Sequence, residues 1–490
     1  MIEAKMFVNG KFKDSEDGTF FESVNPANGN VVALVANGGY KDVEIAVRAA
    51  RKAYIDIWSQ KDPIEKAQIL FNIANEIEKN SDELARLDML ETGKPLADCQ
   101  WDIPACVDIF KYQAGVADKI LGSVYPVQRG SFAFSKREPY GVVAAIIPWN
   151  YPIYNACLKV APILAAGNCC ILKPAEQSSL SALKLAEIMQ KAGLPDGVFN
   201  VVTGIGEKAG AALSLHKDID MISFTGSTEV GRSIMKSSAE SNLKVMSLEL
   251  GGKSPFIIFD DADIEQAVDK ACMTIFFNQG QTCTAGSRLL VQKTIKNKVI
   301  DILLNKIKKI VVGDPLDENT MLGAIVSEEQ FTKVMKYIEL GISEGASLLC
   351  GGKAIHDIPN CEKGFFVEPT VFDNVNNKMR IGKEEIFGPV LSVMTFDTEE
   401  EAIALANDTT YGLAASIWSN SSARVLRMAQ SIDAGIIWSN CVARENTCVP
   451  VGGFKQSGFG KEGALEAGLE YTRLKTVWIN MAEDDPMWIE

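Results

Sequence analysis

The pattern of apolar and polar positions changes along the chain. In residues 41–58 and 64–84, apolar side chains recur at helical spacing between charged ones, behind a short hairpin predicted around residues 8–11. The segments that follow contain short, nearly continuous apolar runs, at 141–148, 168–173, 198–203 and 221–225. Such runs are typical of parallel strands that are buried on both faces. The pattern therefore predicts amphipathic helices first and a buried parallel sheet after them.

Predicted helices alternate with these strands. The clearest helix spans residues 181–191, with serines before it and Gly193 and Pro195 after it. Strand, helix and strand in alternation predict a doubly wound α/β unit. A second series starts after Glu249, with one strand and two helices at 255–259, 264–277 and 297–310. The predicted fold class is α/β, with two doubly wound, Rossmann-like domains and a small β arm formed by the two segments that fit neither series, 117–137 and 471–490.

Charge and length exclude several classes of function. The 490 residues carry a formal net charge of −14. This charge disfavours binding to nucleic acid or to an anionic membrane, because both require a positive surface. The sequence opens without a signal-peptide pattern, and its apolar runs are too short to span a bilayer, so we expect a cytoplasmic protein without membrane contact.

The histidines and cysteines narrow the possible chemistry. The two histidines, His216 and His356, are too few for a histidine-rich metal site or for Ser-His-Asp catalysis. The 11 cysteines contain no CxxC pair with zinc-site spacing, so reduced thiols are expected and no metal is expected. The catalytic base of an enzyme with this composition would be a carboxylate or a lysine.

Cys283 is the candidate nucleophile. It lies in a polar turn with glycines on both sides, directly after an apolar helix. A thiol in such a turn is open to a substrate. Cysteines are more often small buried apolar residues, and we interpret the other ten in that way. By its position alone, Cys283 is a modest candidate.

Glu249 is the candidate base. It stands between two leucines and just ahead of Gly251 and Gly252. Burial among apolar neighbours raises the pKa of a carboxylic acid toward that of a general base at neutral pH. The alternative is a structural ion pair with Lys253, which the local pattern alone favours.

A glycine-containing turn is the candidate phosphate site. Gly226, Ser227 and Gly231 stand where a predicted strand passes into a helix. The unpaired N–H groups at a helix start suit a pyrophosphate. Glycines are also needed in any tight turn between a strand and a helix, so this pattern is weak by itself.

Together these segments resemble the aldehyde dehydrogenase superfamily along nearly the whole chain. The resemblance rests on motifs that follow one another in the family's order: PWNYP (148–152), KPAE (173–176), FTGSTEVG (224–231), LELGGKS (248–254), GQTC (280–283), EEIFGP (384–389), PVGGF (450–454) and SGFG (457–460). Chance agreement of so many motifs in one order is remote.

The resemblance implies a division into domains and an assembly. Residues 1–116 and 138–248 would form an NAD-binding domain, and residues 249–448 a catalytic domain. Residues 117–137 and 471–490 would form an oligomerisation arm. Family members exchange such an arm in dimers or tetramers, so a homodimer or homotetramer is expected, with a small aldehyde as the substrate.

The resemblance also implies catalytic roles. Cys283 would attack the aldehyde, and Glu249 would activate the water that cleaves the resulting thioester. Asn150 and the backbone N–H of Cys283 would stabilise the oxyanion. Lys159 and Glu462 match a family pair that passes protons from the base. These residue types suit the chemistry, because a thiolate attacks carbonyls well and two N–H donors stabilise a developing alkoxide.

NAD is the implied cofactor. Lys173 and Glu176 would hold the adenosine ribose, and Ser227 the pyrophosphate. Glu385 and Phe387 would hold the nicotinamide half. Further contacts are assigned to Ile147, Pro148, Trp149, Gly226, Gly231, Leu250 and Gly251. The negative charge of Glu176 beside the 2′ position favours the hydroxyl of NAD over the phosphate of NADP.

The substrate class has two interpretations. The sequence looks nearest to the betaine-aldehyde and amino-aldehyde branch, which surrounds a quaternary ammonium with aromatic rings. Tyr151 and Phe277 would be such rings, and the product would be glycine betaine. Leu158 and Val451 stand where that branch often has tryptophan, so the alternative is a neutral aliphatic or aromatic aldehyde.

Two further readings concern the activity itself. One is a non-catalytic protein on the same fold, since fold does not establish function. The joint presence of Cys283, Glu249 and Asn150 argues against it. The other is a coenzyme-A-dependent, acylating relative. Such relatives usually lack a glutamate at the position of Glu249, so this residue favours hydrolysis to the free acid.

Overall fold

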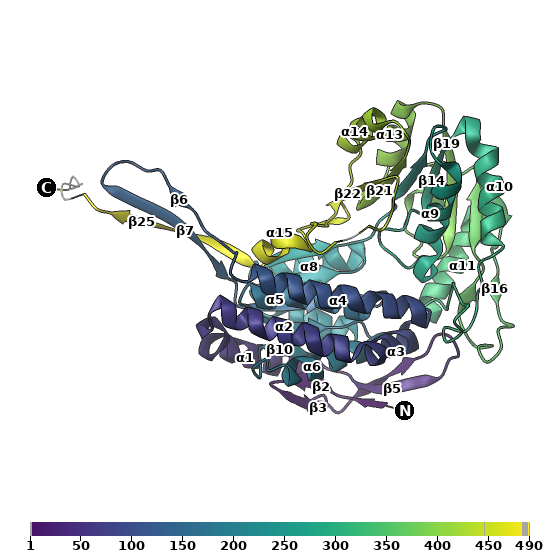
Figure 1. Cartoon of the computed structure of the whole chain (residues 1–490). Coiled ribbons are helices and arrows are strands. Elements are labelled where there is room, and N and C mark those ends of the chain that lie inside the picture. Colours follow the sequence, from purple (N-terminus) through teal and green to yellow (C-terminus); the bar gives the residue numbers. More distant parts are fainter. Residues whose placement is uncertain (1, 445, 483–488, 490) are drawn as a thin grey trace.

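The computed structural model describes residues 2–444, 446–482 and 489. Two large sheets with helices packed around them form the body, and a narrow β arm projects from it (Figure 1). Among the described residues, no helix is both long and apolar enough to cross a membrane.

The first sheet has eight strands in the order β24-β12-β11-β8-β9-β10-β2-β3. Their bounds are β2 Met6–Val8, β3 Lys11–Lys13, β8 Val142–Ile146, β9 Cys169–Lys173, β10 Phe199–Val201, β11 Met221–Thr225, β12 Val245–Glu249 and β24 Gly458–Phe459. The strands from β8 to β12 are parallel to one another, whereas β24 and the hairpin β2–β3 pair antiparallel. The four predicted strand segments and the predicted hairpin are confirmed.

The first half of the chain supplies the helices around the first sheet: α1 Tyr40–Asp56, α2 Pro63–Lys79, α3 Ser81–Thr92, α4 Leu96–Val116, α5 Pro152–Ala165, α6 Leu180–Lys191, α7 Ala211–Leu215 and α8 Thr228–Glu240. Helices α1, α5, α6 and α8 contact its strands, whereas α2 and α4 pack mainly on other helices. The helical segment predicted at 64–84 is divided between two helices. Asn80 separates them with a non-helical backbone, and its side-chain amide donates to the Glu76 carbonyl at 2.7 Å. A side chain that bonds to the backbone in this way competes with helix continuation.

The second sheet has seven strands in the order β15-β18-β19-β14-β13-β21-β22. Their bounds are β13 Pro255–Ile258, β14 Arg288–Gln292, β15 Ser347–Cys350, β18 Thr370–Asp373, β19 Val390–Phe396, β21 Ala414–Trp418 and β22 Ile436–Ser439. Only β15 runs antiparallel to its neighbour. The accompanying helices are α9 Ile264–Phe276, α10 Lys296–Ile307, α11 Glu328–Ser343, α12 Arg380–Lys383, α13 Glu399–Asn407 and α14 Ser422–Ser431. The predicted second α/β series is confirmed.

The arm consists of β6 Val124–Tyr125, β7 Ser131–Pro139 and β25 Thr472–Asn480, and it extends away from both large sheets (Figure 1). Its strands differ at their ends from the predicted segments 117–137 and 471–490, because β6 begins at Val124, β7 continues to Pro139 and β25 begins at Thr472. Tyr471 is buried, and its hydroxyl donates to Ser223 Oγ of β11 at 2.8 Å. Residues 483–488 and 490 of the predicted arm lie outside the described residues.

Shorter elements complete the fold. They are the sheet of β1 Ile2–Ala4, β4 Phe20–Val24 and β5 Val31–Ala36, the strand pairs β16 Ala354–Ile355 with β17 Phe366–Val367 and β20 Tyr411–Gly412 with β23 Phe454–Lys455, and the helix α15 Ala464–Glu470. Because β23 pairs with β20 and β24 pairs with β12, the segment that leads to α15 links the neighbourhoods of the two large sheets.

The strand order places the candidate motifs together. In the first sheet the order reverses beside β8, with β9 and β10 on one side and β11 and β12 on the other. Ligands of open parallel sheets bind outside the carboxyl ends of the strands at such a reversal. The motifs at 148–152, 173–176, 224–231 and 248–254 all overlap or follow the carboxyl ends of these strands. The fold therefore gathers them at one edge.

Candidate active site

The segment that presents Cys283 begins with a strained turn. After α9 ends at Phe276, Asn278 and Gln279 adopt positive φ angles of 49° and 57°, and Gly280 has a φ of 70°. The left-handed conformation costs non-glycine residues roughly 1–2 kcal/mol each. Gly280 also faces backbone, because an added Cβ would lie 2.2 Å from the Gly388 oxygen. Such a turn persists only if its surroundings hold it.

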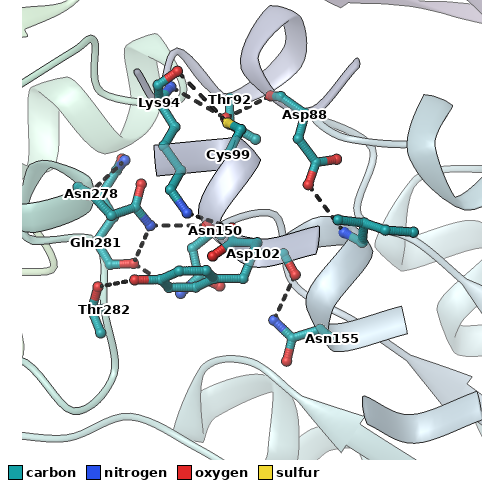
Figure 2. Close-up of polar contacts among 12 residues, drawn as sticks. Asp88, Thr92, Lys94, Cys99, Asp102, Asn150, Asn155, Asn278, Gln281 and Thr282 are labelled. Carbon is teal, nitrogen blue, oxygen red and sulfur yellow. Dashed lines mark hydrogen bonds and ion pairs between the residues drawn. The ribbon is translucent and has the colours of Figure 1, made fainter. Parts of the chain in front are cut away.

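The holding contacts come from the residues that follow β8 (Figure 2). The Asn278 side-chain amide donates to the Asn150 carbonyl at 2.9 Å, and the Asn150 side-chain amide donates to the Gln281 carbonyl at 2.8 Å. The hydroxyls of Tyr151 and Thr282 are hydrogen-bonded at 2.9 Å. Two predicted site residues, Asn150 and Tyr151, therefore clamp the turn that leads to the candidate nucleophile.

Cys283 is half-buried and lies against the backbone that follows β12. An added Cβ on Gly252 would stand 2.3 Å from the Cys283 carbonyl oxygen, so only glycine fits there. This close approach brings the segment after Glu249 beside the segment that carries the thiol. Two motifs about 30 residues apart are thereby joined into one site, as the resemblance implies.

Glu249 ends β12 and is buried. Burial raises the pKa of its carboxyl group, Glu462 raises it further, and Lys159 opposes this rise. Oε1 of Glu249 would lie 3.1 Å from a Cβ added to Gly452, and within the described part of the chain this oxygen has no hydrogen-bond partner. A buried carboxyl group with a raised pKa and an available oxygen can exchange a proton near neutral pH.

Lys159 and Glu462 form a buried ion pair, with 2.5 Å between Nζ and Oε1. Lys159 Nζ also donates to Ser223 Oγ at 3.1 Å. Val451, which pairs its backbone with Glu462, is followed by Gly452, whose added Cβ would lie 3.1 Å from Glu249 Oε1. Glu462 is thereby brought near the candidate base, and both charges of the pair act on the Glu249 pKa. The three residues that the resemblance assigns to proton transfer therefore lie together, although they come from β12, α5 and the segment before α15.

The candidate adenosine and pyrophosphate residues line the strand ends. Lys173 Nζ is buried and lies 3.3 Å from Glu176 Oε2, and the Ile147 N–H donates to the Lys173 carbonyl at 3.1 Å. Ser227 caps α8, where its hydroxyl accepts from the Val230 N–H at 3.2 Å. The buried Thr225 hydroxyl has no hydrogen-bond partner among residues 2–444, 446–482 and 489.

The remaining contacts on this side are made by backbone and small residues. Gly226 N–H donates to the Glu249 carbonyl, and Leu250 N–H donates to the Ser457 carbonyl. An added Cβ on Gly231 would lie 2.8 Å from Leu250 Cδ2. The close packing of Gly231 and Leu250 keeps the start of α8 near the end of β12.

The candidate nicotinamide residues surround a small pocket beside Thr282, lined among others by Gly252, Glu385 and Phe387. Glu385 Oε1 accepts from the Gly252 N–H at 2.8 Å, and an added Cβ on Gly251 would lie 2.5 Å from Glu385 Oε2. A carboxylate that accepts hydrogen bonds, with aromatic and glycine neighbours, suits a planar ring with an amide substituent.

Phe387 has a positive φ of 60°, and its ring stands edge-on to Trp149 with centroids 5.3 Å apart. Trp149 and Pro148 are both half-buried and directly follow β8. The contact therefore joins a loop of the second sheet to the strand end of the first, across the predicted cofactor crevice.

On the substrate side, Tyr151 and Phe277 share a cation that sequence analysis missed. Lys94 Nζ lies 4.2 Å from the Tyr151 ring centroid and 5.4 Å from the Phe277 ring centroid. It also forms an ion pair with Asp102 at 2.6 Å. The only local signal was a lysine between a glycine and a proline at a helix boundary, which carries no chemical meaning by itself.

The two predicted apolar positions, Leu158 and Val451, come from separate parts of the chain. Leu158 is half-buried on α5, and Val451 is half-buried and pairs its backbone with Glu462 at 2.8 Å in both directions. Trp101 is largely exposed and stands edge-on to Phe277, with centroids 6.2 Å apart. Trp101 is a second aromatic residue that sequence analysis did not select.

Comparisons with known proteins match nearly the whole chain. A model described as the aldehyde dehydrogenase family matches residues 12–477. Aldehyde dehydrogenase family 2 member C4 of Arabidopsis thaliana is 48% identical over 476 residues, which cover 96% of this chain and 94% of that protein.

Solved structures agree closely. Indole-3-acetaldehyde dehydrogenase of P. syringae, in complex with NAD+ and IAA, has a TM-score of 0.95 and 42% identity, covering 98% of this chain and 97% of that one. A point mutant of betaine aldehyde dehydrogenase from Staphylococcus aureus, in complex with NAD+, has a TM-score of 0.97 and 38% identity, covering 100% of both chains.

The predicted α/β fold class and the predicted cofactor, NAD, are both confirmed by these matches. The matched region contains every motif on which the resemblance rests. The chain belongs to the aldehyde dehydrogenase family.

Proposed function

We propose that this NAD-dependent aldehyde dehydrogenase oxidises its substrate to the free carboxylic acid through a thioester on Cys283. The observation that carries the proposal is the position of Glu249, which is buried, has a raised pKa and ends the strand whose continuation lies against Cys283. An acylating enzyme needs no base at this point, whereas hydrolysis does.

The first step is addition of the Cys283 thiolate to the carbonyl carbon of the aldehyde. The carbonyl oxygen gains negative charge as the carbon–sulfur bond forms. The side-chain amide of Asn150 and the backbone N–H of Cys283 are the donors we assign to this oxygen. Asn150 is held in place by its bonds to the turn at 278–281, so its amide is oriented before the substrate arrives.

NAD bound at the strand ends supplies the acceptor for the hydride that leaves the substrate carbon. We assign Lys173 and Glu176 to its ribose, Ser227 to its pyrophosphate, and Glu385 and Phe387 to its nicotinamide half. The contact of the Phe387 ring with Trp149 supports this assignment, because it forms a wall across the crevice between the two sheets.

In the last step Glu249 takes a proton from water, and the resulting hydroxide attacks the thioester carbon. The carbon–sulfur bond breaks, the acid leaves, and sulfur departs as thiolate. Glu249 then passes its proton toward the Lys159–Glu462 pair, whose buried charges already act on its pKa. Glu462 raises the Glu249 pKa and so strengthens the base.

For the substrate we propose a neutral aldehyde with an apolar body. The rings of Tyr151 and Phe277, which would have to bind a quaternary ammonium, already contact the Lys94 ammonium at 4.2 and 5.4 Å. Leu158 and Val451 add aliphatic groups where two further rings would be needed. Apolar side chains favour an uncharged substrate, because burying a charge without a partner is costly.

The arm supports the proposal that the chain assembles as a homodimer or homotetramer. Its strands β7 and β25 expose large apolar side chains, including Phe132, Leu474, Trp478 and Ile479. Exposed apolar patches of this kind mark protein contacts. The assignment of residues 117–137 and 471–490 to oligomerisation, and a cytoplasmic location, stay predictions.

We expect Cys283→Ala to abolish aldehyde oxidation and to leave NAD affinity within about twofold of the native value, because the thiol is needed only for the covalent steps. NADH formation and NAD titration by fluorescence measure the two properties. Cys441→Ala, which removes another half-buried thiol, is the control and should stay active. Turnover by Cys283→Ala above about 1% would refute the nucleophile assignment.

We expect Glu249→Gln to form NADH in a rapid burst and then turn over about 100- to 10,000-fold more slowly, since only hydrolysis loses its base. Mass spectrometry should find the acyl group on Cys283. Because the native Glu249 pKa is raised, native steady-state turnover should rise with pH through the neutral range as the base form accumulates. Glu249→Gln should lose that rise, and Glu240→Gln, an exposed control, should keep it.

We expect kcat/KM for 3,3-dimethylbutanal to equal or exceed that for betaine aldehyde, its cationic isostere. Each absent aromatic contact removes roughly 0.5–2 kcal/mol of ammonium binding, or about 2- to 30-fold in affinity. Steady-state kinetics with both aldehydes measure the ratio. A strong preference for the cation would show that other residues complete an ammonium site and would favour the betaine-aldehyde branch.

A further inference from the structure

A buried lysine lies behind the aromatic side chains of the substrate side, and the mechanism above does not use it. Lys94 follows Gly93, which ends α3 with a φ of 74°, and its side chain is only 2% exposed. Figure 2 shows this side chain extending from the Thr92 turn toward Asp102, with Asn278, Gln281 and Thr282 on the neighbouring segment.

The lysine is held as a cation. Burial by itself would lower the pKa of Lys94, but the Asp102 carboxylate raises it above the ordinary value. Nζ and the Asp102 carboxylate lie 2.6 Å apart. Since Asp102 belongs to α4 and Lys94 precedes this helix, the ion pair fixes the cation relative to a rigid element.

The fixed cation faces the Tyr151 ring at 4.2 Å, closer than it faces Phe277. A cation over an aromatic face attracts the ring, most strongly where water is excluded. Burial also raises the pKa of the Tyr151 hydroxyl, so the side chain stays a neutral phenol. The ring is thus held on one face while its hydroxyl remains available for a hydrogen bond.

That hydroxyl bonds to Thr282, the residue before Cys283, at 2.9 Å. The path from Asp102 to the nucleophile therefore consists of an ion pair, a cation–π contact, a hydrogen bond and one peptide unit. It ends on the segment that follows the left-handed turn at Asn278 and Gln279, which depends on outside contacts for its shape.

We propose that Lys94 is a positioning residue that fixes the Cys283 segment through Tyr151 and Thr282, and so sets the reactivity of the thiol toward every aldehyde. The proposal rests on the proposed role of Cys283 as the nucleophile. The competing explanation is that the Lys94–Asp102 pair only stabilises the junction of α3 with α4.

Four variants of the whole chain distinguish the two explanations. Lys94→Met removes the charge at similar length and leaves Asp102 buried without its partner, which is destabilising in itself. The double variant Lys94→Met with Asp102→Asn removes the unpaired charge as well. Asp102→Asn alone tests whether the anchor is needed. Lys66→Met is the matched control, because Lys66 is also buried and lies 5.8 Å from the ring of Trp58, away from the site.

The main measurement is the second-order rate at which iodoacetamide alkylates Cys283, followed by mass spectrometry of the Cys283 peptide. The alkylation measurement needs no aldehyde, so its result can be interpreted even if no tested aldehyde is a substrate. Steady-state kcat and KM for one neutral aldehyde, NAD affinity and the thermal midpoint are measured beside it. The proposed substrate class is tested separately by the pair of isosteric aldehydes.

We expect Lys94→Met and the double variant to react with iodoacetamide about 2- to 30-fold more slowly than the native protein, with a similar loss in kcat. KM and NAD affinity should change less than about twofold. The double variant should regain thermal stability relative to Lys94→Met without regaining reactivity. If Lys94→Met does not fold, the double variant alone decides.

The proposal is overturned if the double variant reacts at the native rate, or if its loss does not exceed that of Lys66→Met. It is also overturned if alkylation and kcat recover in step with thermal stability, because that pattern belongs to a structural ion pair.

Discussion

The site depends on a left-handed turn at the end of α9, a backbone conformation that the surrounding residues must stabilise. Asn278 and Gln279 adopt positive φ angles there, and the following residues bring Cys283 beside the backbone that follows β12. A regular helix end would point the thiol elsewhere. Hydrogen bonds from Asn150 and Tyr151 offset the conformational cost of this turn. The same contacts therefore position both the nucleophile and the candidate oxyanion donor.

The electrostatics of the site follow from the same close packing. Glycines 251 and 252 let Glu385 and the Cys283 backbone approach the residues after β12. Glu249 at the end of this strand is buried, and burial and Glu462 raise the pKa of its carboxyl group. The Lys159–Glu462 ion pair is buried, and both of its charges act on the Glu249 pKa. The Cys283 thiol is therefore half-buried and open to a substrate. The Glu249 carboxyl group lies near the buried Lys159–Glu462 pair, with which it can exchange a proton.

Strands β8 to β11, strand β13 and the helices α1, α6, α9 and α10 could be predicted because their patterns are local. Runs such as 141–148 contain apolar residues that are buried on both sheet faces, and motif glycines such as Gly280 and Gly458 mark positive-φ turns that favour glycine. The break at Asn80 was missed because it depends on a side-chain bond that competes with an otherwise continuous helical pattern. Strands β23 and β24 were missed because two residues are too short for any periodicity.

Candidate site residues that belong to a sequence motif could be predicted. Residues that join the site only through contacts in the folded chain could not. Cys283 and Glu249 were weak candidates separately and gained weight from the order of the motifs. Lys94 and Asp102 were missed, because eight residues and a helix start separate them, and nothing local indicates that they pair beneath Tyr151.

Rapid-quench mass spectrometry of the native enzyme, mixed with a neutral aldehyde and NAD below neutral pH, tests the central claim most directly. At that pH Glu249 is protonated and hydrolysis is slow, whereas formation of the thioester does not depend on this group. We predict that the Cys283 peptide gains the mass of the acyl group at the rate of the first NADH formed. NADH formation without an acyl group on Cys283, or with the acyl group on another residue, would contradict a covalent mechanism at this thiol.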